Sequence, residues 1–353
     1  MDNDSGRAPI KAPFPYFGGK SRVAAAVWER FGDVGNYVEP FAGSLAVLLG
    51  RSHPARIETI NDLDAFIANF WRAVQADPDA VAQWADWPVN EVDLYARHLW
   101  LVNQGRALVN PAALEADPDY YDAKVAGWWV WGISQWIGSG WCAARGANPA
   151  AADAAGEQGG DGNTGRGVHR QLPHLNTGMG VHRRLPHLGN AGMGVHRQLP
   201  HLGDAGRGEF LAGYMRALQE RLRGVRVCCG NWDRVLGPSP TTTLGMTAVF
   251  LDPPYSHAER QGGLYAVETD VAAAVRVWAI ANGDNPLLRI ALCGYFEEHD
   301  ADIPATWERM AWKAQGGYGT QGTGRGRENA AREMIWFNQS CIRPDRPTQT
   351  AMF

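Results

Sequence analysis

An apolar strand that ends in a polar, proline-containing turn is the feature that most constrains this chain. Thr247–Leu251 (TAVFL) is mostly apolar and of strand length, and Asp252, Pro253, Pro254 and Tyr255 follow at once. A continuous apolar run is typical of a strand buried on both faces, as in a parallel sheet covered by helices. Ligands of such open sheets bind at the carboxyl ends of the strands, so the tetrad is the first candidate site.

The tetrad suits chemistry on an aromatic amine, whose lone pair is delocalised into its ring. The Asp252 carboxylate and the Pro253 carbonyl could each accept one amino hydrogen and so direct the nitrogen lone pair toward an electrophile. Tyr255 could stack on the ring. An ordinary turn after a strand would use the same residue types, so the tetrad alone leaves both interpretations open.

Strands and helices alternate on either side of the tetrad. Residues 34–50 predict a strand, a Pro/Gly turn and a helix from Ser44 onward, residues 56–60 predict a second strand, and residues 66–74 a second helix. Further strands are predicted at Val225–Cys229 and at residues 288–293 and 334–337. The alternation predicts an α/β fold with a mainly parallel sheet.

The middle of the chain differs from both ends, which divides the sequence into four parts. Residues 1–75 are the first part of the predicted sheet domain, and residues 76–145 are Trp-rich text that predicts a helical insertion. The tryptophans from Trp128 to Trp141 are expected in a helix core rather than on a base-stacking surface. Residues 146–208 are a Gly-rich linker with repeats, and residues 209–353 complete the sheet domain.

Two glycine-containing segments precede the tetrad. Residues 17–20 (FGGK) lie near the start, and residues 39–44 (EPFAGS) follow the first predicted strand. Glycine at such turns lets a nucleoside-like ligand approach the backbone closely, although each segment alone is a weak signal.

Taken in order, PYFGGK, YVEPFAGS, INDLD and FLDPPY make the chain resemble the Dam-type DNA adenine methylases, the alpha-ordered N6-adenine methyltransferases. The resemblance covers residues 13–75 and 225–338. It implies a Rossmann-like sheet that binds S-adenosyl-L-methionine, an inserted, mostly helical target-recognition domain, base flipping, and methyl transfer to the N6 amino group of adenine in double-stranded DNA.

By matching position, the resemblance implies a catalytic tetrad at Asp252–Tyr255 and a set of cofactor-binding residues. That set is Tyr16, Phe17, Gly18, Gly19, Lys20, Glu39, Pro40, Phe41, Ala42, Gly43, Ser44, Asp62 and Asp233. Asp62 would accept hydrogen bonds from the ribose hydroxyls. Three simpler interpretations stay open: a solvated Lys20, an Asp62 that only caps a helix, and an Asp233 that only shapes a turn.

A short basic repeat supplies the phosphate-binding charge that the chain as a whole, at a net charge of −4, does not. The unit GVHR[QR]LPHL begins at Gly167, Gly180 and Gly194, and residues 165–226 hold ten arginines and no lysine. The arginines expected to contact DNA are Arg170, Arg183, Arg184 and Arg197, with Arg325 and Arg327 in a later glycine-rich stretch. A basic tether without a fixed fold is the alternative interpretation of the repeat.

Composition narrows the remaining possibilities. The five cysteines form no CxxC pair, so no metal is expected, and no apolar stretch has the length of a membrane helix. A cytoplasmic protein of a bacterium or its phage is expected. The rival functions are a cytosine N4 methyltransferase, a catalytically inactive DNA-binding relative, and an RNA or protein methyltransferase of similar fold.

Overall fold

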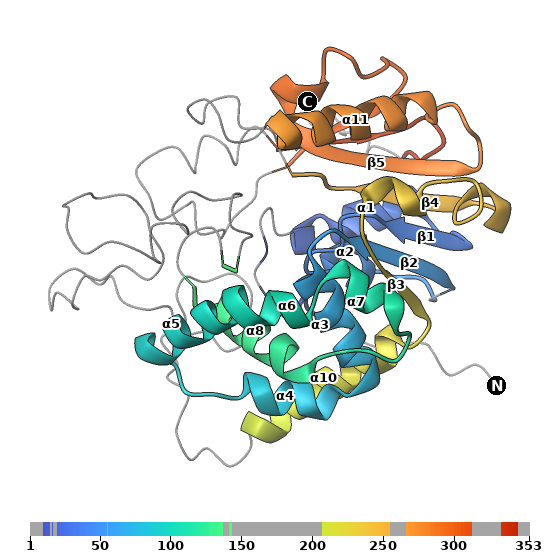
Figure 1. Cartoon of the computed structure of the whole chain (residues 1–353). Helices are drawn as coiled ribbons and strands as arrows, with labels where there is room; N and C mark the ends of the chain where they lie inside the picture. The colour runs from blue at the N-terminus through green and yellow to red at the C-terminus, as the bar shows by residue number, and fades with distance from the viewer. Residues whose placement is uncertain are drawn as a thin grey trace, which may run out of the picture.

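A seven-stranded sheet forms the centre of the protein (Figure 1). The computed structural model describes residues 10–14, 16, 20–54, 56–136, 141–142, 207–254, 266–312 and 333–344. The strands are β1 (Asn36–Glu39), β2 (Ile57–Asp62), β3 (Val225–Cys229), β4 (Thr247–Leu251), β5 (Leu288–Tyr295), β6 (Glu308–Ala311) and β7 (Glu333–Phe337). Their order across the sheet is β3-β2-β1-β4-β5-β7-β6.

The first five strands in this order are parallel, and β7 runs antiparallel between β5 and β6. The predicted mainly parallel α/β fold is therefore confirmed, and it fits a methyltransferase fold. All five residues of β4 are buried, as its apolar sequence predicts.

Alternate residues of the strands enter two cores, one on each face of the sheet. Tyr37 and Phe250 belong to the core beneath the helices α1 (Ala24–Phe31), α3 (Ala65–Ala76) and α10 (Arg207–Leu222). Val38 and Val249 belong to the core beneath α11 (Ala266–Ala281). This alternation follows from the two-residue period of a strand.

The Trp-rich region is helical, as predicted. It contains α4 (Pro78–Ala85), α5 (Glu91–Trp100), a π-helical turn (Leu101–Gly105), α6 (Arg106–Leu108), α7 (Pro111–Ala116) and α8 (Ala123–Gln135). Figure 1 shows these helices gathered with α10 beside the β2 and β3 end of the sheet. Trp129, Trp131, Trp136 and Trp141 are buried, which confirms the core interpretation for these four. Trp84 and Trp87, which precede that stretch, are exposed.

Helix boundaries near the first strand differ from the prediction. The helix expected from Ser44 onward is only α2 (Ala46–Leu49), because Gly43 and Leu45 have positive φ angles of 45° and 55°. Left-handed residues cannot continue a right-handed helix, so residues 40–45 form a loop. Further short helices are η1 (Lys20–Arg22), η4 (Trp232–Val235), η5 (Thr242–Leu244) and α12 (Phe296–His299).

A buried ion cluster joins the two halves of the chain. Glu58 on β2 accepts hydrogen bonds from Arg51 at 3.1 Å and from two nitrogens of Arg221 on α10 at 2.7 and 2.9 Å. Glu58 is almost fully buried, so its charge is compensated by these two guanidinium groups rather than by water.

We expect Glu58→Gln to lower the free energy of unfolding by about 3 kcal/mol, because it leaves two guanidinium groups without their carboxylate. Urea unfolding measures the change. The matched control is Glu220→Gln on the exposed surface of α10, which should change stability by less than about 0.5 kcal/mol. Equal midpoints for the two variants would contradict this role of the cluster.

Candidate functional site

The site lies where the strand order reverses. From β1 the chain proceeds outward to β2 and β3 on one side, and to β4 and β5 on the other. A crevice forms outside the carboxyl ends of the strands at such a point. Pro40 follows β1 and Asp252 follows β4, so two of the segments singled out in the sequence meet at this crevice.

A buried lysine pairs with the aspartate of the tetrad. Lys20 Nζ lies 3.0 Å from Asp252 Oδ1 and 3.9 Å from Glu333 Oε2, with the Trp312 ring centre 4.9 Å away. The Lys20 side chain is only 5% exposed, which rules out the interpretation of a solvated lysine. Burial lowers the pKa of Lys20, but Asp252 and the other nearby anionic groups outweigh burial and raise it above its ordinary value.

Glu39, the last residue of β1, is buried at the same edge. It accepts a hydrogen bond from the Tyr37 hydroxyl at 2.8 Å. Burial raises the pKa of Glu39 to about 8, although the Tyr37 hydrogen bond opposes the shift. Without a bound cation, Glu39 is therefore mainly protonated at neutral pH.

The loop after β1 is held open by its backbone geometry. Gly43 donates its N–H to Asp62 Oδ2 at 3.0 Å, and its carbonyl accepts from Trp71 Nε1 at 3.0 Å. With φ at +45°, a Cβ at Gly43 would stand 2.7 Å from Tyr16 Cδ1. Glycine is thus required here both for backbone conformation and for the approach of Tyr16.

Asp62 ends β2 beside this loop. Its second oxygen accepts from the Asp64 N–H at 2.9 Å, and burial raises the pKa of Asp62 to about 7. The helix cap is Asp64, whose side chain accepts from the Phe66 N–H at 3.0 Å. The interpretation of Asp62 as only a cap of α3 is therefore wrong.

Asp233 lies in η4, after β3, and is exposed. Its neighbour Trp232 stacks on Phe41, with ring centres 6.3 Å apart and planes 24° apart. This stack brings the segment after β3 to the loop after β1. The other predicted positions in that loop, Ala42 and Ser44, are buried.

Sequence reasoning missed Glu333, Trp312 and Tyr37, which the fold brings to the site. Tyr37 precedes Glu39 and could have been noticed as a strand residue with a hydroxyl, but Glu333 and Trp312 belong to no motif. Pro253 is buried and Pro254 exposed. Several predicted residues lie outside the described residues: Phe17, Gly18, Gly19, Tyr255, Arg170, Arg183, Arg184, Arg197, Arg325 and Arg327.

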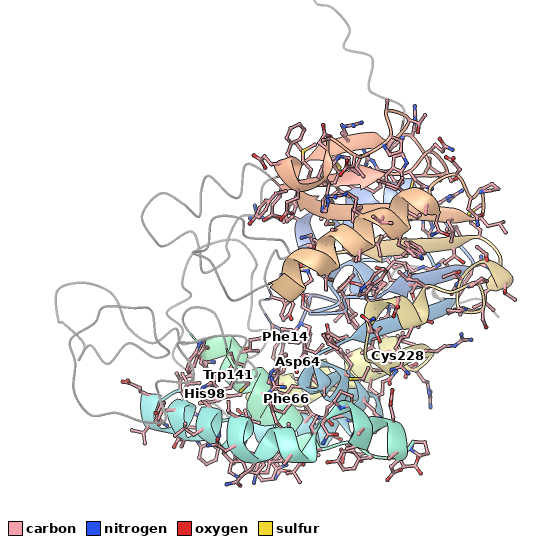
Figure 2. The ribbon with its side chains drawn as sticks, turned by 45° about the horizontal axis from the view of Figure 1, so that its top comes forward. Phe14, Asp64, Phe66, His98, Trp141 and Cys228 are labelled. Carbon is pink, nitrogen blue, oxygen red and sulfur yellow. The ribbon has the colours of Figure 1, made fainter. Side chains whose placement is uncertain are left out.

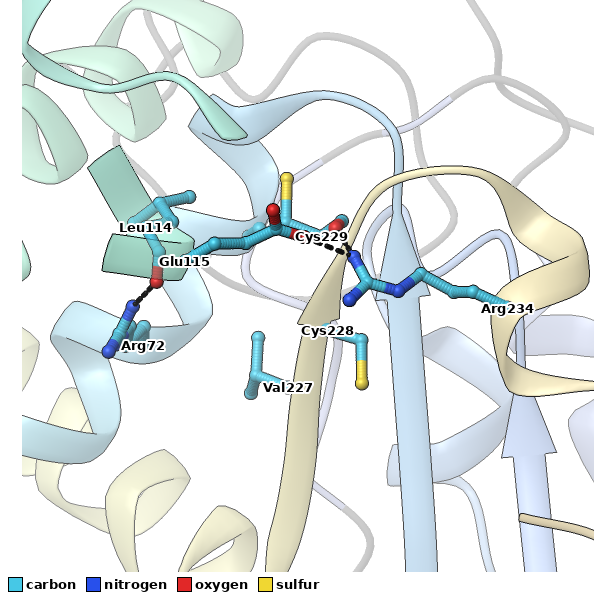
Figure 3. Close-up of a pocket in the computed structure, with 8 residues that line it drawn as sticks. Arg72, Leu114, Glu115, Val227, Cys228, Cys229 and Arg234 are labelled. Carbon is cyan, nitrogen blue, oxygen red and sulfur yellow. Dashed lines mark hydrogen bonds and ion pairs between the residues drawn. The ribbon is translucent and has the colours of Figure 1, made fainter. Parts of the chain in front are cut away.

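A separate cavity of about 140 Å³ lies beside β3 (Figure 3). Arg72 on its wall donates to the Leu114 carbonyl at 2.7 Å, and Arg234 pairs with Glu115 at 2.8 Å. Both guanidinium groups thus bind the protein itself, and the cavity does not include Asp252 or Lys20.

Two kinds of feature are absent from the described residues. They contain no group of three or more His, Cys, Asp and Glu residues arranged to hold a metal ion. None of their helices has the length and apolar character needed to span a membrane.

Residues 16–94 match a family model described as D12 class N6 adenine-specific DNA methyltransferase. The match includes Tyr16, Lys20, the loop after β1, and Asp62. No curated protein matches the chain.

Glu39 makes the stability of the folded protein depend on pH. Its folded-state pKa of about 8 exceeds the ordinary value of 4.5, so its contribution to stability is lost as the pH rises through this window. The Glu39→Gln variant has no such carboxyl group. As the pH rises from 4.5 to about 8 without cofactor, its free energy of unfolding should therefore rise relative to that of the wild type by up to about 1.4 kcal/mol per pH unit. Thermal and urea unfolding from about pH 5 to pH 9 measure this difference.

Exposed Glu29→Gln is the control and should follow the wild type at every pH. Parallel stability curves for Glu39→Gln and the wild type would show that Glu39 is ionised throughout the window.

Proposed function

We propose that the chain is a D12 class N6 adenine-specific DNA methyltransferase, which uses S-adenosyl-L-methionine to methylate the N6 amino group of an adenine flipped out of double-stranded DNA. It is thus an enzyme of DNA modification. The observation that carries the proposal is the Lys20–Asp252 pair at the crevice where the strand order reverses, surrounded by further carboxyl groups.

The charge of this crevice fits the proposed cofactor. Four carboxyl groups lie at the crevice, those of Glu39, Asp62, Asp252 and Glu333. Among the described residues, Lys20 is the cation that pairs with two of them, Asp252 and Glu333. S-adenosyl-L-methionine carries a sulfonium, an ammonium and one carboxylate, a net charge of +1. The raised pKa values of Glu39 and Asp62 indicate carboxyl groups that a cationic ligand would stabilise as anions.

Particular residues would hold each part of the cofactor. The Asp62 carboxylate, oriented by the Gly43 and Asp64 N–H groups, would accept hydrogen bonds from the ribose hydroxyls. The stacked pair of Phe41 and Trp232 offers an apolar surface for the adenine ring, with Asp233 beside it. When bound, the cofactor supplies an electrophilic methyl group on sulfur.

Asp252 would prepare the amine of the target adenine. Its carboxylate and the Pro253 carbonyl accept the two N6 hydrogens, which directs the nitrogen lone pair out of the ring plane toward the methyl group. Lys20 holds Asp252 Oδ1 at 3.0 Å and so fixes the orientation of the carboxylate. After transfer, the methylated nitrogen is acidic and loses its proton to Asp252 or to water.

We expect Asp252→Ala to reduce methyl transfer by at least about 10³-fold while the protein still binds cofactor, with an affinity lowered no more than about tenfold. The purified protein is incubated with duplex DNA and methyl-labelled S-adenosyl-L-methionine, and the nucleosides are identified by mass spectrometry. Asp86→Ala, at an exposed aspartate on the helical side, is the matched control and should retain full activity.

Labelled N6-methyladenine in the wild type supports the proposal, and N4-methylcytosine would replace adenine with cytosine as the substrate. An Asp252→Ala variant with near wild-type turnover would exclude the role given to this carboxylate. A wild type that binds cofactor and DNA but transfers no label would identify an inactive relative.

Target recognition is proposed for residues 76–208, the helical insertion and the basic repeats. Deleting residues 165–208 should weaken DNA binding and flatten its salt dependence, since it removes Arg170, Arg183, Arg184 and Arg197. Affinity is measured by fluorescence anisotropy over a series of salt concentrations. Cofactor affinity is the internal control, and an unchanged salt slope would exclude phosphate contacts by the repeats.

A further inference from the structure

Glu333 introduces a charge into the site that the described residues do not balance. Lys20 is the one ammonium group of this cluster, and its closest carboxylate is Asp252 at 3.0 Å. Glu333 Oε2 stands farther away, at 3.9 Å, beyond hydrogen-bond distance. Within the described part of the chain this oxygen is buried without a hydrogen-bond partner.

The position of Glu333 is fixed by the sheet. It is the first residue of β7 and pairs with Tyr295, the last residue of β5, in the antiparallel register. Its backbone carbonyl accepts from the Trp312 N–H at 3.2 Å, and the Trp312 ring covers Lys20. The carboxylate therefore enters the crevice from the strand pair next to β4, with its side chain only 8% exposed.

A buried carboxylate is costly unless a cation is near it. Burial raises the pKa of Glu333 to about 6, and Lys20 opposes the shift. Glu333 is therefore ionised at neutral pH. Two carboxylates then face one ammonium group, and the cluster of Lys20, Asp252 and Glu333 carries a net charge of −1.

We propose that Glu333 is a specificity-determining residue that makes the site prefer a cationic cofactor over its neutral product. The inference rests on the proposed function, because it concerns the cofactor assigned there. Methyl transfer converts a sulfonium into a neutral thioether. The Glu333 carboxylate attracts the positive sulfonium of the cofactor but not the neutral thioether of the product. It therefore favours binding of the cofactor and release of the product.

Two ligands that differ in the charge at the position of the cofactor sulfur test the inference by binding alone, without methyl transfer. S-adenosylhomocysteine has the neutral sulfur, and sinefungin has a protonated amine in place of the methylsulfonium. Isothermal titration calorimetry at about pH 7.5, where Glu333 is ionised, measures the affinity of the full-length protein for each. We expect Glu333→Gln to weaken sinefungin binding about tenfold and S-adenosylhomocysteine binding by less than about twofold.

Two further variants separate charge from structure. Glu333→Asp keeps the negative charge and should retain most of the preference for sinefungin. Glu29→Gln removes an exposed carboxylate on α1 and should change neither affinity.

Equal weakening of both ligands by Glu333→Gln would assign Glu333 a purely structural role and overturn the inference. Unchanged affinity for both would overturn it as well. In either case the proposed function stands, because the wild type still binds both ligands. A wild type that binds neither ligand would instead refute the cofactor, and the inference with it.

Discussion

The pairing of β1 with β4 is the contact on which the site depends. These strands lie about two hundred residues apart in the chain, yet Asn36 pairs with Thr247 and Val38 with Val249 in a parallel register. Buried Asn36 reinforces the pair by donating its side-chain amide to Thr247 Oγ1 at 3.0 Å and to the Pro240 carbonyl at 2.8 Å. Because parallel strands end at the same edge, this register brings the loop after β1 and Asp252 to one crevice.

The same edge concentrates acidic groups at a cost in stability. Burial raises the pKa of Glu39, Asp62 and Glu333, so each is less readily ionised in the folded protein than in the unfolded chain. Buried carboxyl groups that lower the stability of the fold are typical of functional sites. A bound cation would relieve it, so we expect cofactor to stabilise the protein most at the alkaline end of its range.

The sequence predicted what depends on local pattern. The apolar run of β4, the strand at Ile57–Asp62 and the helix Ala65–Ala76 are each determined by residues next to one another. Glu39, Lys20 and Asp62 were singled out as candidate site residues by ordered motifs. The late start of α2 was not predictable, because nothing in the residue types at Leu45 signals a left-handed backbone.

The missed residues have a different cause. Glu333 and Trp312 reach Lys20 only through the antiparallel register of β7 between β5 and β6. A register between distant strands is set by packing and turn geometry, and a single acidic residue at a strand end gives no sign of its partner. The arginines expected to contact DNA lie outside the described residues and stay a prediction.

The helix α3 connects the side of the site that is proposed to bind cofactor with the helical insertion. At one end, Asp64 caps α3 directly beside Asp62, and Trp71 holds the Gly43 carbonyl. At the other side, the Asn69 amide exchanges two hydrogen bonds of 2.9 Å with the backbone of Asp122, which caps α8.

Arg106 adds a second connection from the insertion. One of its nitrogens lies 3.7 Å from Asp64 Oδ1, and another donates to the Cys142 carbonyl. Arg106 also lies over the Phe66 ring of α3, 4.6 Å from its centre. Figure 2 labels Asp64 and Phe66 together with the insertion residues Trp141 and His98, and the rings of the last two are 5.2 Å apart. These bonds fix the insertion to the loop that would bind the cofactor. A recognition surface built on α8 would therefore take its position relative to Asp252 from α3, whatever conformation the basic repeats adopt.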